Sequence, residues 1–296
     1  MRINRKNFFR LVGLASAGLV VKRAQSGNIG PYTTHHVQTY NMNGFSAPKL
    51  DKVRIGFIGI GSRGSGVVSR FAQVEGADIK ALCDLVPERI ERAKERISRH
   101  SHKPEAYTGN PEAWKRLCES NDIDLVVITT PWALHGPQAI YALEQGKHVA
   151  IEIPGVKTLE ECWKIVEVSE RKRKHCTLMA NSAYGDFNLL VLNMAREGFF
   201  GDIVHGEGAY IHDRVSDPGR WERNPDNNYW FSYRPWRLKE NINRNGNLYA
   251  AHGLHTICQV MDINCGDQLT HMVSMTSEDF TWGKKMEEIA KKDDFF

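Results

Sequence analysis

The sequence lacks the residue patterns that mark a metal site or a disulfide framework. Its 296 residues include six cysteines, none in a C-x-x-C or zinc-finger spacing, and there is no H-E-x-x-H motif and no internal repeat. Most of the cysteines lie within apolar runs, so buried free thiols are expected. An excess of one charge is also absent, because 39 basic and 35 acidic residues leave a net charge of +4. We therefore expect neither a metal ion nor a nucleic-acid partner.

The apolar run near the N-terminus is too short to span a membrane. This run, Leu11–Val21, follows basic residues and resembles the hydrophobic region of a signal peptide. Asn4–Arg10 is similar to a twin-arginine export motif with Lys6 at the second arginine. We expect residues 1–25 to direct export of a folded protein to the periplasm. The alternatives are an ordinary secretory signal or an uncleaved amphipathic end, and the protein is cytoplasmic if the signal does not function. No cysteine follows the run, so no membrane anchor is expected.

The composition of residues 26–50 predicts an extended linker. The alternation of strand-like and helix-like segments after it predicts an α/β fold. Apolar strand-like runs alternate with amphipathic segments over residues 51–181, which indicates a Rossmann domain with a doubly wound parallel sheet. The expected strands are Val53–Ile60, Asp78–Asp84, Asp124–Pro131, His148–Pro154 and Cys176–Asn181. The expected helices are Val67–Phe71, Pro87–Arg99, Pro111–Cys118, Pro137–Gln145 and Leu159–Arg173.

The stretch Val53–Gly66 organises this domain, because there a strand leads through glycines into a helix. Gly59, Gly61 and Gly64 have the spacing G-x-G-x-x-G, which permits a tight turn, close approach of a pyrophosphate and close helix packing. The helix N-terminus then offers free N–H groups to the anion. Asp84 ends the next expected strand, where a carboxylate can bind ribose hydroxyls. We expect NAD rather than NADP; the alternative is a glycine-rich turn without a ligand.

The ends of the expected strands indicate where a ligand lies. In doubly wound sheets, ligands bind beyond the carboxyl ends of the strands. Those ends carry Asp84, Thr130–Trp132, Glu152 and Asn181. We expect these residues to surround one crevice.

The second half, residues 182–296, predicts an α+β domain with a largely antiparallel sheet. Asn188–Arg196 has the pattern of a helix, and Ile203–Ile211 alternates like a strand. Residues 213–247 are rich in Trp, Tyr, Arg and Asn, which suit a sugar with apolar faces and hydroxyl edges. The alternative is that these aromatic side chains hold a long loop against the core. The charged end adds no strand, so this domain is expected to be incomplete.

Motifs in both halves resemble known families. The glycine motif, Asp84, Thr130–His135 and Glu152–Pro154 resemble the glucose–fructose oxidoreductase/inositol dehydrogenase (Gfo/Idh/MocA) superfamily. The second half is similar to glycoside hydrolase family 109, the NAD-dependent α-N-acetylgalactosaminidases. The resemblance covers about residues 1–280, and its motifs in the second half are Gly206–Asp213, Trp236–Asn241, Asn243–Tyr249, His252–Leu254 and Leu269–Phe280.

The resemblance implies an unusual glycosidase with a small glycoside substrate. Such enzymes do not use a pair of carboxylates. NAD takes a hydride from C3 of the sugar, a base removes the acidified C2 proton, the C1–O bond breaks by elimination, and water addition and hydride return follow. A homo-oligomer would form through the C-terminal sheet. Ile153 stands where dehydrogenases of the superfamily carry a lysine, which favours a glycosidase over a net sugar oxidoreductase. A non-catalytic NAD-binding remnant is the third hypothesis.

The matched motifs also imply roles for individual residues. Tyr210 and His252 are the expected proton-transfer residues, since both side chains are competent acid–base groups. The expected sugar-binding residues are Tyr210, Arg237, Tyr249, Ala250, Ala251 and His252. The expected cofactor-binding residues are Gly59, Gly61, Ser62, Arg63, Gly64, Asp84, Trp132, Ala133, Leu134, His135, Glu152, Ile153 and Asn181.

Two departures from the family motifs predict weak activity. Ala180 stands where the family has a glutamate that resembles a sugar ligand, and Ala250 and Ala251 replace a Pro-Thr pair. Together with the short C-terminal end, these changes predict that activity on N-acetylgalactosaminides is impaired.

Overall fold

The computed structural model describes residues 37–211, 223–224, 229–230, 236, 240, 249–275, 284, 287–288 and 291. Apart from Val37, these residues belong to one compact unit, Gln38–Phe296. The expected signal segment, residues 1–25, and Arg237 lie outside the described residues. Within the described part of the chain, no helix combines the length and the apolar character needed to cross a membrane.

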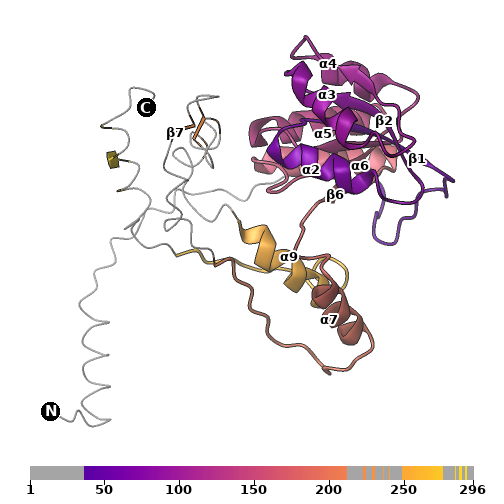
Figure 1. The fold of residues 1–296 in the computed structure, drawn as a ribbon. Coiled ribbons are helices and arrows are strands. Elements are labelled where there is room, and N and C mark those ends of the chain that lie inside the picture. The colour runs from indigo at the N-terminus through magenta and orange to yellow at the C-terminus, as the bar shows by residue number, and fades with distance from the viewer. Residues whose placement is uncertain are drawn as a thin grey trace, which may run out of the picture. The chain divides into compact units, whose positions relative to one another are not determined.

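A six-stranded sheet forms the centre of the first half (Figure 1). Its order is β3-β2-β1-β4-β5-β6, and every neighbouring pair is parallel. The chain therefore moves outward from β1 to β3 and then crosses to β4 on the other side of β1. This reversal leaves a crevice beyond the carboxyl ends of β1 and β4, where doubly wound sheets bind ligands. The strands are β1 Val53–Ile58, β2 Ala77–Cys83, β3 Glu105–Tyr107, β4 Leu125–Ile128, β5 His148–Ile151 and β6 Cys176–Leu178.

Helices pack on both faces of the sheet, because the central strands are apolar on both sides. Ile55 and Phe57 of β1 belong to one buried cluster with residues of α2 and α3. Ile58 points to the opposite face and joins a second cluster with residues of α4, α5 and α6. Burial of each such side chain contributes about 1.5–3 kcal/mol. The helices are α2 Ser62–Phe71, α3 Pro87–Arg96, α4 Ala113–Glu119, α5 His135–Glu144 and α6 Leu159–Lys172, with the 3-10 turn η1 at Trp132–Leu134.

The predicted α/β fold is confirmed, and each strand and helix expected between residues 53 and 173 has a counterpart. Strand β3 was not predicted. It has only three residues, of which Glu105 and Ala106 are exposed, so it gives no apolar run in the sequence.

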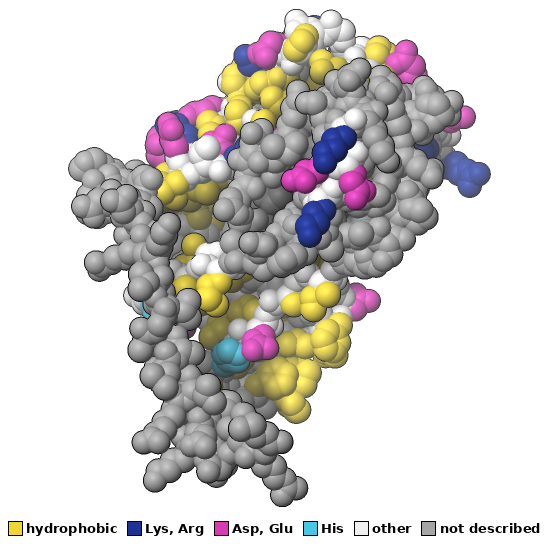
Figure 2. All heavy atoms as spheres, turned by 90° about the vertical axis from the view of Figure 1, so that its left-hand side faces the viewer, with side chains coloured by type: hydrophobic (Ala, Val, Ile, Leu, Met, Phe, Trp, Pro, Cys, Tyr) yellow, Lys and Arg dark blue, Asp and Glu magenta, His cyan; other side chains and the backbone are white. Residues whose placement is uncertain are grey.

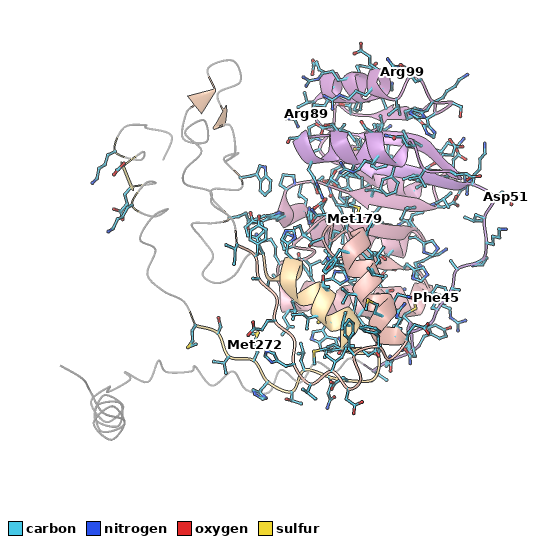
Figure 3. All side chains as sticks on the ribbon, turned by 60° about the horizontal axis from the view of Figure 1, so that its bottom comes forward. Phe45, Asp51, Arg89, Arg99, Met179 and Met272 are labelled. Atoms are coloured by element: carbon cyan, nitrogen blue, oxygen red, sulfur yellow. The ribbon has the colours of Figure 1, made fainter. Side chains whose placement is uncertain are left out.

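The described part of the predicted linker, residues 37–50, has no helix or strand but packs on the Rossmann domain. The Thr39 N–H donates a hydrogen bond of 3.0 Å to Glu170 of α6. The Arg173 guanidinium lies 4.4 Å from the centre of the Tyr40 ring. The ring of Phe45, which Figure 3 labels, lies 4.9 Å from that of His175. These contacts tie residues 39–45 to α6 and β6.

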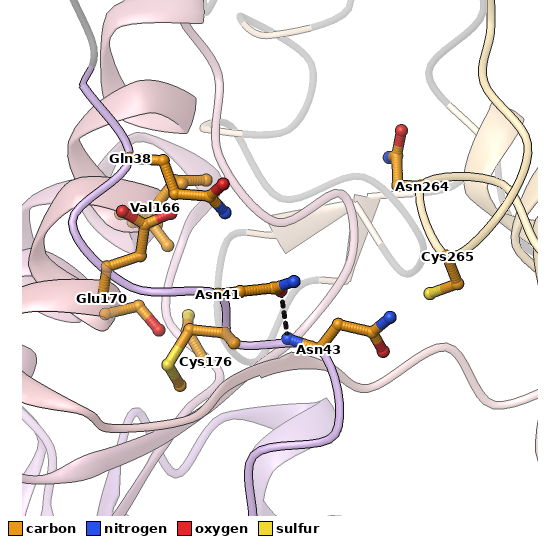
Figure 4. A pocket seen from close by; sticks show the side chains of 11 residues that line it. Gln38, Asn41, Asn43, Val166, Glu170, Cys176, Asn264 and Cys265 are labelled. Atoms are coloured by element: carbon orange, nitrogen blue, oxygen red, sulfur yellow. Dashed lines mark hydrogen bonds between the residues drawn. The ribbon is translucent and has the colours of Figure 1, made fainter.

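A pocket of about 340 Å³ lies between this segment, α6 and residues 264–265 (Figure 4). Two of its lining residues are joined by a hydrogen bond of 2.9 Å, which the Asn43 N–H donates to the side chain of Asn41 (Figure 4). None of the predicted site residues lines this pocket.

In the second half, two helices pack against each other: α7 Asp186–Arg196 and α9 Ala250–Val260. The helix predicted at 188–196 is confirmed by α7, whereas α9 was not predicted. Among the described residues the only antiparallel pairing joins β7 Arg223–Asn224 to β8 Tyr229–Trp230. Hydrophobic side chains of α7 are exposed, among them Phe187 and Leu190. Figure 2 shows a face of the molecule on which exposed hydrophobic side chains lie in several groups.

The prediction of a strand at Ile203–Ile211 was wrong. This stretch has no strand or helix assignment, and its residues are largely exposed. A strand needs a neighbouring strand to pair its backbone N–H and C=O groups, and the structure pairs no described strand with it. Alternate residues do face one neighbour, but that neighbour is helix α9. A Cβ atom on Gly206 would lie 2.9 Å from Ile257, and one on Gly208 would lie 2.8 Å from the backbone of Gly253.

Candidate cofactor and sugar site

The turn after β1 has a backbone that only glycine can form. Gly59 has φ +91°, a conformation that L side chains rarely adopt. A Cβ atom on Gly64 would lie 2.0 Å from the carbonyl oxygen of Gly59, so the start of α2 sits directly on the turn. The Thr129 hydroxyl, at the end of β4, donates a hydrogen bond of 2.5 Å to the same oxygen. The glycines thus serve the close packing that the G-x-G-x-x-G spacing predicts.

The N-terminus of α2 suits an anion. Gly61 is its N-cap residue, and no side chain caps the helix. The first turn, which contains Ser62, has no acidic residue. The first N–H groups of a helix lack intrahelical partners and carry the positive end of the helix dipole. A pyrophosphate therefore fits this position without competition from a side chain.

Asp84 lies where the sequence predicts, just beyond the end of β2, and is only 8% exposed. One carboxylate oxygen accepts a hydrogen bond of 2.7 Å from the Ile60 N–H in the glycine turn. The other accepts one of 2.9 Å from the Val86 N–H and forms an ion pair of 3.2 Å with Arg89 of α3, which Figure 3 labels. A carboxylate offers about four lone-pair positions, so three donors leave about one for a ribose hydroxyl. Asp84 therefore also holds the turn in shape.

An ion pair bridges the glycine turn and the end of β5. Arg63 Nε lies 2.5 Å from a carboxylate oxygen of Glu152, whose side chain is 9% exposed against 48% for Arg63. The following residue, Ile153, is half-buried and donates its N–H to the other oxygen of Glu152 at 3.2 Å. Two of the predicted cofactor-binding side chains are thus brought together from opposite sides of the crevice.

The segment after β4 divides into interior and surface residues. His135 is buried, and its ring nitrogens lie 3.0 Å from the Gly155 carbonyl oxygen and 2.8 Å from that of Thr130. Burial lowers the pKa of His135. Its imidazole thus connects the loops after β4 and β5, which leaves no ring nitrogen for a cofactor. Ala133 and Leu134 are exposed.

Trp132 is buried and links this segment to the second half of the chain. Its ring packs edge-on against Trp236, with centres 5.4 Å apart, and against Tyr249, with centres 6.4 Å apart. Lys157, between β5 and α6, forms an ion pair of 2.6 Å with Glu240. Trp236 and Glu240 flank the predicted sugar ligand Arg237, which itself lies outside the described residues.

Three rings of the predicted sugar site stack on one another. The Tyr210 ring lies 4.7 Å from that of His252 at an interplanar angle of 14°, and 4.9 Å from that of Tyr249 at 19°. We call Tyr210, Tyr249 and His252 the ring stack. It forms because Gly208 and Gly253 let their backbones touch, which brings the following Tyr210 beside the first turn of α9.

His252 is connected electrostatically to the cofactor crevice. Burial lowers the pKa of its imidazole, Glu152 acts in the opposite direction, and Arg63 lowers the pKa further. A neutral imidazole is the form that can accept a proton near neutral pH. The Ser182 hydroxyl lies 3.3 Å from His252 Nδ1. No pattern in the sequence predicts this contact, although Ser182 directly follows the nominated Asn181.

The remaining predicted residues lie in different environments. Asn181 is exposed beyond β6, whereas Ala180 is completely buried. Ala250 and Ala251 form the first turn of α9, beside the ring stack. Within the part of the chain that the structure describes, no cluster of His, Cys, Asp and Glu side chains could hold a metal ion.

Comparison with known proteins identifies relatives of both halves. Residues 53–181 match the model of the oxidoreductase family with an NAD-binding Rossmann fold, which confirms NAD as the cofactor. Residues 184–293 match the C-terminal domain of glycosyl hydrolase 109. The solved structure of an NAD binding oxidoreductase from Klebsiella pneumoniae shares the fold, with a TM-score of 0.57 and 22% identity over 72% of this chain and 54% of that one.

Curated relatives have higher sequence identity to this chain than that solved structure has. Glycosyl hydrolase family 109 protein 1 of Bacteroides fragilis is 46% identical over 238 residues, which are 79% of this chain and 48% of that protein. A protein of Shewanella oneidensis named alpha-N-acetylgalactosaminidase is 41% identical over 277 residues, 93% of this chain and 59% of its own length. The chain thus spans about half the length of the curated relatives it matches. By both family matches and by these identities, the chain is similar in both halves to glycoside hydrolase family 109, within the Gfo/Idh/MocA superfamily.

Proposed function

We propose that the protein is an NAD-dependent glycosidase that hydrolyses α-N-acetylgalactosaminides. The observation that carries the proposal is the ring stack, in which a tyrosine and a histidine lie face to face and the histidine is coupled to the Arg63–Glu152 pair. The name of the Shewanella oneidensis relative supports the choice of sugar.

The residues of the crevice fit the cofactor. The uncapped N-terminus of α2 would hold the pyrophosphate, and the remaining lone pair of Asp84 would bind a ribose hydroxyl. When bound, NAD supplies a reversible hydride acceptor, so that a sugar carbon can be oxidised and its neighbouring C–H acidified. Arg63 and Glu152 would border the end of the cofactor that lies nearest to His252.

The ring stack supplies the groups for proton transfer. His252, kept neutral by burial, would accept the sugar proton that oxidation acidifies. The Tyr210 hydroxyl would donate a proton to the departing glycosidic oxygen. Aromatic faces such as that of Tyr249 suit the C–H surface of a sugar. No pair of carboxylates is needed for this route, in contrast to ordinary glycosidases.

We further propose that activity is weak. At position 180 the chain has a buried methyl group where a carboxylate would bind sugar hydroxyls. A lost hydrogen bond to a charged group costs about 1.5–3 kcal/mol, or about 10- to 150-fold in kcat/KM.

A second candidate is a sugar oxidoreductase, because the Rossmann half matches an oxidoreductase family. Under this proposal the hydride is not returned to the sugar, and NADH accumulates. Export through residues 1–25 is a separate proposal. Sequencing the mature N-terminus from the native host tests it, and an intact Met1 in a cytoplasmic fraction would contradict it.

The deciding assay measures release of p-nitrophenol from its α-N-acetylgalactosaminide with and without NAD, while NADH absorbance is recorded. Glycosidase chemistry predicts NAD-dependent release without accumulation of NADH. Accumulation of NADH with free sugar would instead establish the oxidoreductase. Tyr210→Phe and His252→Gln should each abolish release while NAD still binds in calorimetry. Binding of NAD without either reaction would refute the proposal and favour a non-catalytic remnant.

A further inference from the structure

The hydroxyl of Ser182 contacts His252 in two ways. Its Oγ lies 3.3 Å from Nδ1 of the imidazole and 3.5 Å from the backbone oxygen of the same residue. Ser182 lies in the turn beyond β6, and His252 lies in the first turn of α9. One side chain therefore connects the carboxyl edge of the sheet to the helix that carries the proposed proton-transfer residue.

The backbone of Ser182 is itself held in place. Its carbonyl oxygen accepts hydrogen bonds from the Asn188 side-chain amide at 2.5 Å and from the Gly185 N–H at 3.2 Å. Both donors belong to the start of α7. The next residue, Ala183, is buried. Because Oγ lies within reach of both Nδ1 and the backbone oxygen of His252, rotation about the Cβ–Oγ bond decides which of the two the hydroxyl hydrogen faces.

This geometry supports two protonation patterns of a neutral imidazole. If the Ser182 hydroxyl donates to the His252 carbonyl, its oxygen can accept the proton on Nδ1, which leaves Nε2 with a lone pair and therefore basic. If the hydroxyl donates to Nδ1, then Nε2 carries the proton and can act as an acid. In both cases Ser182 engages Nδ1, and among the described residues Nε2 has no hydrogen-bond partner.

We propose that Ser182 is a positioning residue: it fixes Nδ1 of His252, so that Nε2 exchanges the proton with the substrate. This inference rests on the proposed glycosidase function, but the Ser182–His252 contact itself does not. The described groups that face the imidazole are Glu152 at the end of β5, Arg63 of α2 and the rings of Tyr210 and Tyr249. Among the described residues, only Ser182 forms a hydrogen bond with Nδ1, and this bond distinguishes the two ring nitrogens.

The contact is tested first without substrate, by ¹⁵N NMR of the imidazole in the full chain. The His252 resonances are assigned by their loss in His252→Gln. Ser182→Ala should shift the Nδ1 resonance and change the tautomer ratio, whereas Ser182→Thr, which keeps a hydroxyl, should resemble the wild type. The matched control is Ser69→Ala. The Ser69 hydroxyl donates a hydrogen bond of 3.0 Å to the carbonyl oxygen of Ser65 in the same helix, α2, so its loss should leave the His252 resonances unchanged. Unchanged His252 resonances in Ser182→Ala would overturn the proposal, whether or not the protein is a glycosidase.

The role in the reaction is tested by pH profiles of kcat and KM. Ser182→Ala should lower kcat about tenfold, as expected for the loss of one hydrogen bond, with little change in KM. It should also shift the side of the pH–kcat profile that reports the ionisation of His252. Ser182→Thr should restore both. If Ser182 only stabilises the fold, Ser182→Ala would instead lower the melting temperature and leave the pH profile unchanged, and this result would refute the positioning role. If the wild type shows no glycosidase activity, the proposed function fails, and the NMR comparison still decides the contact.

Discussion

Removal of the Asp84 carboxylate should weaken NAD binding and the fold together. Asp84→Ala leaves the Ile60 N–H without its partner at 2.7 Å, and Ile60 is only 2% exposed. An unsatisfied buried donor costs about 1–3 kcal/mol. The Val86 N–H and the Arg89 guanidinium are nearer to solvent and lose less. For a chain of this size, a loss of about 2 kcal/mol lowers the melting temperature by about 3 °C.

Asp84→Ala should also lower the affinity for NAD, which is measured separately from stability. A ribose hydroxyl that donates to a carboxylate contributes about 1.5–3 kcal/mol, so affinity should fall about 10- to 150-fold. Calorimetric titration with NAD measures the affinity, and thermal unfolding without NAD measures the stability. Asp84→Asn keeps one acceptor oxygen for the Ile60 N–H but brings an NH₂ group toward the donors of Val86 and Arg89. It should therefore retain more stability than Asp84→Ala but bind NAD weakly.

The matched control is Asp78, at the opposite end of the same strand. Its carboxylate pairs with Lys80 at 3.3 Å, far along β2 from the glycine turn. Asp78→Ala should leave NAD affinity unchanged. If Asp84→Ala unfolds at a lower temperature but binds NAD as tightly as the wild type, the carboxylate is structural only. If neither quantity changes, Asp84 neither holds the glycine turn in shape nor binds the ribose.

Three further predictions follow from contacts elsewhere. Gly208→Ala places a Cβ atom 2.8 Å from Gly253, which should separate the ring stack and lower kcat/KM at least tenfold in the p-nitrophenol assay. A double-mutant cycle of Lys157→Met and Glu240→Gln should show a coupling of about 0.5–1.5 kcal/mol in urea unfolding, because this ion pair is partly buried; additive effects would mean that the pair contributes nothing. Burial lowers the pKa of His148 from 6.5 to about 4. The neutral ring is therefore favoured in the folded state, so the contribution of His148 to stability should be constant above pH 6.5 and fall as the pH decreases toward 4, and His148→Asn should flatten that decrease.

The Rossmann half could be predicted because its signals are local and agree with one another. The apolar run Val53–Ile58 must be buried on both faces, and glycines in a fixed spacing end it. Asp84 could be nominated from its distance along the chain. Its bond to the Ile60 N–H could not, because that bond depends on how β1 and β2 are aligned in the sheet.

The second half was harder to predict because its contacts are not local. The alternation in Ile203–Ile211 indicates an extended chain with one face against a neighbour, and periodicity alone does not say what that neighbour is. Here Gly208 meets Gly253, which lies much later in the chain, on a helix that the sequence pattern did not predict. Tyr210 and His252 are similarly distant in the sequence, so their stacking could be implied only by family resemblance.

Position 180 shows why a missing residue cannot simply be restored. The family resemblance implies that a sugar-binding glutamate is replaced at position 180, but Ala180 is fully buried while Asn181 is exposed. A glutamate there would enter a packed interior, and burial of an unpaired carboxylate costs several kcal/mol. The side chains packed around Ala180 therefore leave no room for the carboxylate that Ala180→Glu would introduce. Loss of activity in Ala180→Glu would thus report damage to the fold, and only a variant that keeps its melting temperature can report on the sugar contact.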